Sequence, residues 1–599
     1  MLQVRPQTLD ARRATPLSAA DTFRRTRRIL LQRRLFILAL NVLTVGSLAA
    51  TMAYVLAAGG WTWPKAGMWV SFVITLPWLS IGFWNAVIGM VLLARGPVAD
   101  DPLALTDAPQ LPITTRTAVV MAVRNEEAGR SIGRLRAIFE DIEANGLAPH
   151  FDIHVLSDTN DPAIAAEEER LVAAWREESG HADQIFYRRR TVNRAYKAGN
   201  LEDFCDAYPN AYDYFLPLDA DSFMSAATIA KLVRIMQRHR RIGILQTLVI
   251  GTPSTSLFTR IFQFGMRHGM RSYTAGSVWW TGDCGPYWGH NAIIRMKPFR
   301  EHCRMPVLPW KGPLGGWVMS HDQVEAVMMR RAGYHVRVLA EEGESWEENP
   351  PTLPDYIRRD LRWCQGNMQY FQLIGMPGLK FLSRVQLALA IVMFLSPVAW
   401  MAFIAFGTAA LFVVPEGGGA YPADVGLALF VAILTMSLSP VLMGLAGVLM
   451  DRSMSQRYGG RPRVLASGLV QIVASMLISP VVALATAVFC VGLFLGARID
   501  WRAQPRGQRS VTWGEALQTF VPQTLFGATL LTVLALFAPG VLPWAAPVIV
   551  GMVLSIPFAV VTSLRTPGVW SRRVRLCDVP EDAAPPPVLR KLQETVPAI

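Results

Sequence analysis

Long apolar stretches alternate with polar ones and divide the chain into two kinds of segment. Apolar runs occupy residues 35–58, 68–94, 386–414, 424–450, 464–497, 518–538 and 541–564. Each run reaches or exceeds the roughly 20 residues that a helix needs to cross the hydrocarbon core of a membrane. Apart from Asp424 at one edge, the runs contain no Asp, Glu, Lys or Arg. The pattern predicts a polytopic α-helical membrane protein, and the first run is too long for a cleavable signal peptide.

The placement of arginine predicts the orientation of these runs. Nine arginines precede Leu35, and segments 451–463 and 498–510 are also rich in arginine. The positive-inside rule places all three segments in the cytoplasm. Both ends of 464–497 must then lie on one side, so this run, with Pro480 near its middle, is interpreted as a hairpin of two short spans or a re-entrant pair. With that hairpin we expect about eight crossings and both termini inside.

The part of the chain between the second and third runs follows a different pattern. Short apolar stretches at 117–123, 151–157, 212–218 and 242–250 alternate with helical spacing at 126–145, 161–178 and 192–207. Strands that alternate with helices are typical of an α/β domain on a largely parallel sheet. Ligands of such sheets bind beyond the carboxyl ends of the strands. We therefore expect a cytoplasmic ligand-binding domain inserted between membrane helices.

Composition agrees with this division. The chain is 52% hydrophobic and 17% charged, with a net charge of +13, whereas soluble domains carry about 25% charged residues. Six scattered cysteines without a CxxC pair indicate neither a zinc module nor a disulfide framework. The predicted parts are a basic cytoplasmic segment (1–34), two transmembrane helices (35–94), the α/β domain (95–385), about six further spans (386–564) and a cytoplasmic tail (565–599) whose Pro-rich and acidic end predicts disorder.

The strongest chemical motif is FLPLDADSF at 215–223, where an apolar strand ends in Asp219 and Asp221. Two carboxylates at a strand end, together with a diphosphate, supply the oxygen ligands that Mg²⁺ or Mn²⁺ prefers. The alternative is that both are solvated turn carboxylates ahead of the helix that starts at Ser225. The position directly after a buried strand favours the metal site.

Polar groups also follow the other strands. Arg124 and Glu126 come after the first strand, and Asp158 and Asp161 after the second. Asp161, and less readily Asp158, could instead cap the next helix. Cations then gather in 187–204, and Arg and Lys recognise phosphate oxygens. A diphosphate ligand beside the two carboxylates is therefore favoured over a merely solvated basic helix.

Several motifs together resemble one family. They are the Asp after the second strand, the R-x-x-N-x-x-x-KAGNL segment at 190–201, the Asp-x-Asp pair, SHD at 320–322 and RRDLRW at 358–363. This set resembles the processive family 2 glycosyltransferases of the cellulose- and hyaluronan-synthase type, which are inverting enzymes with a GT-A fold. GDCGPYWGHNAIIR (282–295) and RWCQGN (362–367) are similar to the branch of that family that makes the β-1,2-linked glucose backbone of osmoregulated periplasmic glucans from UDP-glucose.

The resemblance implies roles for particular residues. Asp322 would be the general base, and Asp219 and Asp221 would handle the diphosphate and its divalent metal. The implied nucleotide-sugar contacts are Asp158, Lys197, Asn200, Arg124 and Glu126. The implied diphosphate and acceptor contacts are Arg362, Trp363, Gln365, Trp288 and His290. Asp322 also opens a helical segment, so it could act as a helix cap instead of, or besides, its role as base.

The chain departs from the family's motifs at two places. The usual Thr-Glu-Asp is Ser320-His321-Asp322, which leaves the base in place. The Gln expected three residues before Arg362 is Arg359, which weakens the role carried over to that position. The aromatic residues of 277–291 could bind a sugar ring or pack in the core, and the acidic run 341–349 is interpreted as a solvated loop.

The sequence thus favours an inverting inner-membrane glucosyltransferase that takes UDP-glucose and a growing glucan and exports its product. Its partners would be Mg²⁺ or Mn²⁺, membrane lipid and, by resemblance, acyl carrier protein and a periplasmic glucan-processing protein, with no nucleic acid. Alternatives are another processive β-glycan synthase, a polyprenyl-phosphate sugar transferase and a transporter. Ion-coupled carriers place ionisable residues inside their spans, and these runs have almost none.

Overall fold

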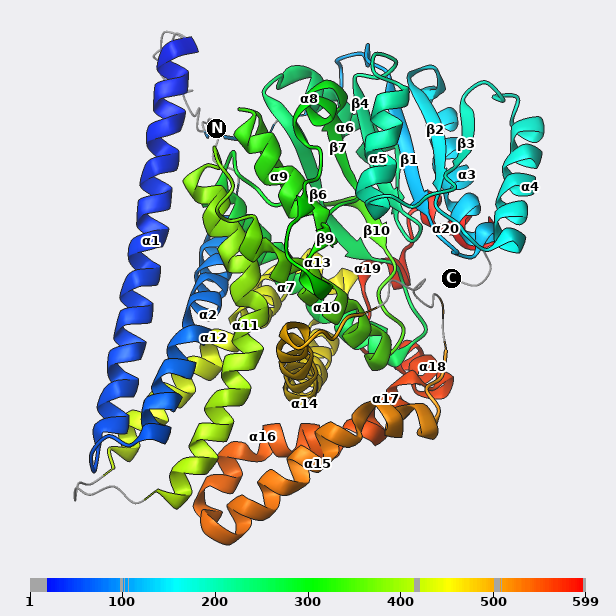
Figure 1. Cartoon of the computed structure of the whole chain (residues 1–599). Coiled ribbons are helices and arrows are strands. Elements are labelled where there is room, and N and C mark those ends of the chain that lie inside the picture. The colour runs from blue at the N-terminus through cyan, green and yellow to red at the C-terminus, as the bar shows by residue number, and fades with distance from the viewer. Residues whose placement is uncertain are drawn as a thin grey trace, which may run out of the picture.

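The computed structural model describes residues 19–595 except 97–100, 102, 106, 414–420, 500–506 and 508. The predictions for 1–18, for most of 498–510 and for 596–599 lie outside the described residues. Figure 1 shows two parts, an α/β domain and a set of long helices that run beside and below it.

Six helices are long and apolar enough to cross a membrane, judged by length and composition over the described residues. They are α1 (Ala19–Ala57), α2 (Trp63–Arg95), α11 (Phe381–Ala409), α12 (Ala423–Met450), α14 (Arg461–Phe494) and α15 (Trp513–Phe537). A seventh candidate is the broken pair α16 (Leu542–Val553) and α17 (Ser555–Ser563), bent by 57°. The eight expected crossings are therefore not found in the described part of the chain.

The predicted hairpin at 464–497 is wrong, because α14 is one continuous helix through Pro480. A proline inside a membrane helix is tolerated where neighbouring helices and hydroxyl side chains compensate for the lost hydrogen bond.

Near the start of α14, Ser467 accepts a hydrogen bond from the Cys577 amide at 2.8 Å, and beyond its end Gln365 accepts one from the Ile499 amide at 3.0 Å. The helix contacts α10 (Leu353–Met368), where Thr486 donates to Asp360 at 3.3 Å, and Figure 1 shows it nearly end-on below that helix.

An eight-stranded sheet forms the centre of the α/β domain. Its strands are β1 (Thr117–Val123), β2 (Phe151–Ser157), β3 (Ile185–Arg189), β4 (Tyr214–Asp219), β5 (Phe223–Met224), β6 (Ile242–Gly251), β7 (Ala292–Arg295) and β10 (His335–Glu347). The strand order is β3-β2-β1-β4-β7-β6-β10-β5. Strands β3, β2, β1 and β4 are mutually parallel, and β7 runs antiparallel to its neighbours. The predicted α/β architecture on a largely parallel sheet is confirmed.

Helices cover both faces of this sheet (Figure 1). Val119 and Met121 of β1 face one hydrophobic core and Ala118 and Val120 face another, as expected for a strand buried on both sides. The first core includes residues of α3 (Ala128–Ala144), α4 (Pro162–Ser179) and α6 (Ala226–Arg238); the second includes residues of α5 (Tyr196–Ala207), α8 (Met296–His302) and α9 (His321–Arg331). Asp161 caps α4 by accepting from the amides of Ala163 and Ile164, so its role is the capping one.

The predicted disorder of the tail is corrected over 565–595, where the structure has α18 (Arg565–Val574), α19 (Pro580–Ala583) and α20 (Pro587–Thr595). Leu589 and Leu592 of α20 are fully buried against the first core. The acidic residues of the tail pair with buried arginines of α7 (Leu257–Thr281), including Arg260 with Asp578 at 2.5 Å. Here the acidic side chains, which favour disorder in a free chain, neutralise buried cations.

The acidic run 341–349 is likewise no solvated loop, because most of it belongs to β10. Trp346 is fully buried there, and Glu348 forms ion pairs with Arg130 and Arg134 of α3.

Candidate active site

A cavity of about 230 Å³ lies where the carboxyl ends of the central strands meet α9 and α10. Most of the residues that the sequence predicted line it: Arg124, Glu126, Asp158, Lys197, Asp219, Asp221, Trp288, His290, Asp322, Arg362 and Trp363. They come from segments up to about 240 residues apart, Arg124 to Trp363. The fold therefore gathers separate strand ends and helix starts around one space.

The strand register explains how the first of these side chains meet. Val123 at the end of β1 pairs with Ser157 of β2, and Ala122 pairs with Asp219 of β4. Three neighbouring parallel strands thus end at nearly the same level. Arg124, Asp158 and Asp219 follow or occupy these ends, so backbone pairing alone brings them to one edge.

Lys197 reaches the same edge from a tight turn before α5. Ala195 and Tyr196 both have left-handed backbone angles, with φ of 54° and 53°. A side chain on Gly199 would place Cβ only 2.0 Å from the Arg194 carbonyl oxygen, so the turn requires glycine there. The Lys197 ammonium forms an ion pair with Asp219 and donates to the Gly289 carbonyl at 2.8 Å. The KAGNL motif therefore holds a cation against the first carboxylate of the Asp-x-Asp pair.

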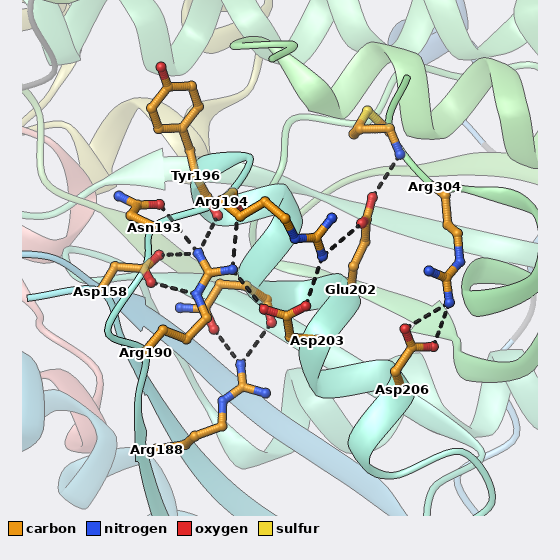
Figure 2. Close-up of polar contacts among 12 residues, drawn as sticks. Asp158, Arg188, Arg190, Asn193, Arg194, Tyr196, Glu202, Asp203, Asp206 and Arg304 are labelled. Carbon is orange, nitrogen blue, oxygen red and sulfur yellow. Dashed lines mark hydrogen bonds and ion pairs between the residues drawn. The ribbon is translucent and has the colours of Figure 1, made fainter. Parts of the chain in front are cut away.

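Asp158 is held by arginine and caps no helix. Arg190 donates to both of its carboxylate oxygens, at 2.7 and 2.8 Å, and also bonds Asp203 at 2.9 Å. Figure 2 shows this arrangement, with Asn193 and the Tyr196 carbonyl completing the surroundings of the guanidinium. The pair fixes the direction of the Asp158 carboxylate at the rim of the cavity.

Asp322 lies in the first turn of α9, where the positive end of the helix dipole favours a carboxylate. Burial raises the pKa of Asp322 above its ordinary value, and the neighbouring imidazole of His321 opposes the rise. His321 is bonded to Glu325 one turn further on, at 3.0 Å. The arrangement provides a half-buried carboxylate with increased proton affinity, as a general base needs.

Helix α10 closes the other side of the cavity with Arg362 and Trp363. Its approach depends on Gly366, because a Cβ there would lie 2.0 Å from Ser320 Oγ. Arg359, the residue that departs from the family motif, also lines the cavity and stacks over the Trp363 ring at 4.8 Å.

Of the aromatic residues in 277–291, Trp288 is the one found in the described lining of this cavity. Trp280 packs with helices α1 and α2 and donates to Asn85 at 2.9 Å, and Tyr287 is fully buried in the second core. His290 bonds Ser222 at 3.1 Å and pairs with Glu347 at 3.3 Å. These contacts hold the His290 imidazole at the edge of the cavity.

Two predicted residues do not line the cavity. Asn200 is fully buried, where it donates to the Leu156 carbonyl and accepts from Arg188. Gln365 bonds the Pro313 carbonyl and the Ile499 amide. Both hold neighbouring segments in place and do not face the enclosed space.

Several lining residues were not predicted as site residues, among them Asn193, Tyr196, Ser320, His321 and Glu347. Asn193 lies inside the R-x-x-N motif, so the motif itself could have indicated it. Glu347 is the last residue of β10. This strand was not predicted, because the acidic composition of 341–349 was interpreted as a loop.

Asp219 and Asp221 fit a divalent metal that is shared with a diphosphate. Among the described residues, no group of three His, Cys, Asp or Glu side chains could hold an ion alone. Mg²⁺ commonly binds through one or two carboxylates and completes its shell with substrate phosphates and water. The Asp219 side chain is 40% exposed, so it is accessible to such a ligand.

Comparison with known proteins defines the class first. The profile of glycosyl transferase family 2 matches residues 118–303, and that of glycosyl transferase family group 2 matches residues 214–435. The α/β domain is thus a glycosyltransferase domain of GT-A-like fold. The chain belongs to the family of glucans biosynthesis glucosyltransferase H.

The curated relatives that show this family align over most of the chain. The relative from Cupriavidus pinatubonensis is 36% identical over 94% of this chain and 67% of its own length. Those from Pseudomonas entomophila and Escherichia coli K12 are 37% and 35% identical, each over 88% of this chain and 64% of their own. The chain therefore spans about two thirds of the length of these relatives. Among solved structures, a Pyrobaculum calidifontis mannosyltransferase in complex with GDP-Man and Mn²⁺ is 16% identical, with a TM-score of 0.43, over 68% of this chain and 99% of its own.

Proposed function

We propose that this chain polymerises glucose from UDP-glucose, with inversion, into the β-1,2-linked backbone of osmoregulated periplasmic glucans. The observation that carries the proposal is the shared cavity. A half-buried carboxylate on α9, Asp322, lines the same space as the strand-end pair Asp219 and Asp221. Lys197 and Arg362 line that space as well, so an acid–base group, metal ligands and phosphate-binding cations converge.

The donor side of the reaction needs charge stabilisation for the departing UDP. Lys197 and Arg362 supply fixed positive charge for the diphosphate oxygens. Asp219 and Asp221 would hold the divalent ion, which supplies Lewis-acid stabilisation of the phosphate charge when bound. Asp158, fixed by Arg190, presents a hydrogen-bond acceptor for the nucleobase.

The acceptor side needs one base. Asp322 removes the proton of the attacking glucose hydroxyl as that oxygen bonds to the anomeric carbon and UDP leaves. A single carboxylate is sufficient because the leaving group is already acidic, unlike glycoside hydrolysis, which uses two. Trp363 is 47% exposed and, with Trp288, offers aromatic faces to the sugar rings.

The same proposal places the catalytic domain in the cytoplasm and the long helices in the bacterial inner membrane. The nine arginines that precede Leu35 support this orientation. The growing neutral glucan leaves through the nearly uncharged helices. Acyl carrier protein and a periplasmic glucan-processing protein are the partners expected by resemblance.

The test uses the purified full chain in lipid with Mg²⁺ and a panel of UDP-sugars, followed by linkage analysis of the product. We expect UDP release and a β-1,2-linked glucan with UDP-glucose only, and neither with Asp322→Asn. A different linkage, or turnover of another sugar at equal rate, would replace the proposed product with that of another β-glycan synthase.

A further inference from the structure

A second and larger cavity, of about 1020 Å³, lies at the opposite edge of the sheet from the candidate active site. Ile242 and His335, the first residues of β6 and β10, line it, together with one face of α1 and the start of α11. It shares no lining residue with the active-site cavity. It is therefore a separate site, bounded by the catalytic domain and by two of the long apolar helices.

The lining of this cavity is strongly basic. Seven of its side chains are arginines: Arg27, Arg34, Arg238, Arg240, Arg241, Arg330 and Arg337. Asp283 is the sole acidic residue among the described lining residues, and its two carboxylate oxygens accept from Arg34 at 2.6 Å and from Arg330 at 2.7 Å. One carboxylate shared by two arginines leaves a large excess of positive charge, which an anionic ligand would neutralise.

Part of this positive charge is buried inside the protein, at Arg337. The residue is only 7% exposed, it donates to the Leu103 carbonyl, and its Nε has no hydrogen-bond partner. Burial lowers the pKa of Arg337 to about 10, although Asp283 and Asp101 oppose the shift. A buried cation that lacks a close carboxylate is costly unless an anion binds near it.

The apolar side of the cavity continues along α1. Leu30 and Leu31 line the cavity, and Leu31, Leu35, Leu38 and Val42 follow one another at helical spacing on one exposed face. These four side chains are 56%, 55%, 55% and 64% exposed. We call the surface formed by Leu31, Leu35, Leu38 and Val42 the apolar track. A ligand whose charged end lies in the cavity could place an apolar chain along this track, toward the middle of the helix.

We propose that this cavity binds the phosphate headgroup of an anionic glycerophospholipid whose acyl chains lie along the exposed face of α1. Basic pockets next to the cytoplasmic ends of membrane helices bind such headgroups. Lys380, which directly precedes α11, adds a further cation at the same level. A soluble phosphate compound would satisfy the arginines but would leave the apolar track uncovered.

The experiment titrates the purified full chain, in a neutral detergent, with short-chain phosphatidylglycerol or phosphatidylcholine and counts bound lipids by native mass spectrometry. The test variant is Arg238→Gln/Arg240→Gln, because both residues are exposed at the rim of the cavity. The matched control is Arg452→Gln/Arg457→Gln, which removes two exposed arginines beside α12 and α14. We expect saturable phosphatidylglycerol binding that weakens about tenfold or more in the test variant and less than about twofold in the control.

A second variant tests the track. Leu31→Glu introduces a charge on the exposed face and should weaken phosphatidylglycerol binding while the thermal midpoint of the lipid-free protein stays unchanged. Competition by inorganic phosphate or glycerol 3-phosphate at concentrations similar to those of the lipid would overturn the lipid assignment. So would unchanged binding in Arg238→Gln/Arg240→Gln, or an equal loss in the control. Lipid binding is measured without turnover, so this outcome is independent of the proposed function.

Discussion

Arg190 donates hydrogen bonds to both carboxylate oxygens of Asp158, and the side chains of both residues are less than a tenth exposed. Two parallel hydrogen bonds to a planar guanidinium fix both the position and the plane of a carboxylate. In the proposed mechanism, Asp158 is therefore held in one orientation at the cavity rim before the nucleotide arrives. The arginine of the R-x-x-N motif acts through this aspartate, as a positioning residue.

Arg190→Lys should raise the KM for UDP-glucose about tenfold with a much smaller change in kcat. Lysine keeps the charge but cannot donate the paired bonds that orient Asp158. Steady-state kinetics over a range of UDP-glucose concentrations measures the effect. Arg304→Lys is the control, since Arg304 also donates to both carboxylate oxygens of an aspartate, exposed Asp206, but from one guanidinium nitrogen (Figure 2). An equal rise in KM in both variants would contradict the positioning role.

Asp322→Asn should reduce glucosyl transfer by about 10²–10⁴-fold, the usual contribution of a positioned base. UDP binding, measured by calorimetry, should change little because the diphosphate is held by other residues. Asp206→Asn is the control. It changes an exposed carboxylate and should leave the rate of transfer unchanged. Loss of transfer and of UDP binding together in Asp322→Asn would count against a base role.

The rate should also fall on the acidic side of its pH profile. In the proposed mechanism Asp322 works as a carboxylate, and burial raises its pKa above the ordinary value of 3.8. The rate of transfer is therefore maximal above that raised pKa, where Asp322 is deprotonated. It falls as the pH drops through the pKa. The profile of kcat/KM for UDP-glucose gives the apparent pKa, and a midpoint at or below the ordinary aspartate value would refute this account.

Removing divalent ions with a chelator should abolish transfer, and Mg²⁺ or Mn²⁺ should restore it. Asp221→Asn should raise the metal concentration needed for half-maximal rate, because it removes one anionic oxygen ligand. A metal titration of wild type and variant checks this. Full activity of either protein in chelator would remove the metal from the proposed mechanism.

Leu592→Ala should destabilise the protein by roughly 2–5 kcal/mol, because it opens a cavity in the core that α20 closes. The midpoint of thermal unfolding in detergent, followed by tryptophan fluorescence, should fall clearly. Val307→Ala serves as control, since Val307 is 60% exposed on β8 (Val307–Leu308). A Leu592→Ala midpoint within about a degree of wild type would mean that the tail is not part of the core.

Much of the catalytic site could be predicted because its signals are local. A strand that is buried on both faces is recorded in consecutive apolar residues, and the polar group that follows it marks the strand end. Asp158, Asp219 and Asp221 were found in this way, and parallel pairing then brings the strand ends together. The same logic failed for 341–349, because the strand there carries acidic side chains that pair with cations of other elements. Glu341 pairs with Lys231 of α6 and Glu342 with Arg267 of α7, which interrupts the usual apolar pattern.

Segment 464–497 shows where local signals mislead. Pro480 predicts a break, yet packing beneath α10 and beside neighbouring helices keeps α14 continuous. The hairpin inferred from Pro480 and from the arginines at both ends of this segment is therefore absent.

The order of residues along the chain is enough to show which stretches are apolar enough for a membrane and which carboxylates follow buried strands, because both depend on neighbours within a few residues. Tertiary structure alone decided that Arg190 holds Asp158, that the acidic tail neutralises the arginines of α7, and that arginines from residue 27 to residue 337 surround one cavity. Charges that meet across hundreds of residues leave no periodic trace in the chain. Only the folded geometry brings them within the few ångströms at which they attract one another.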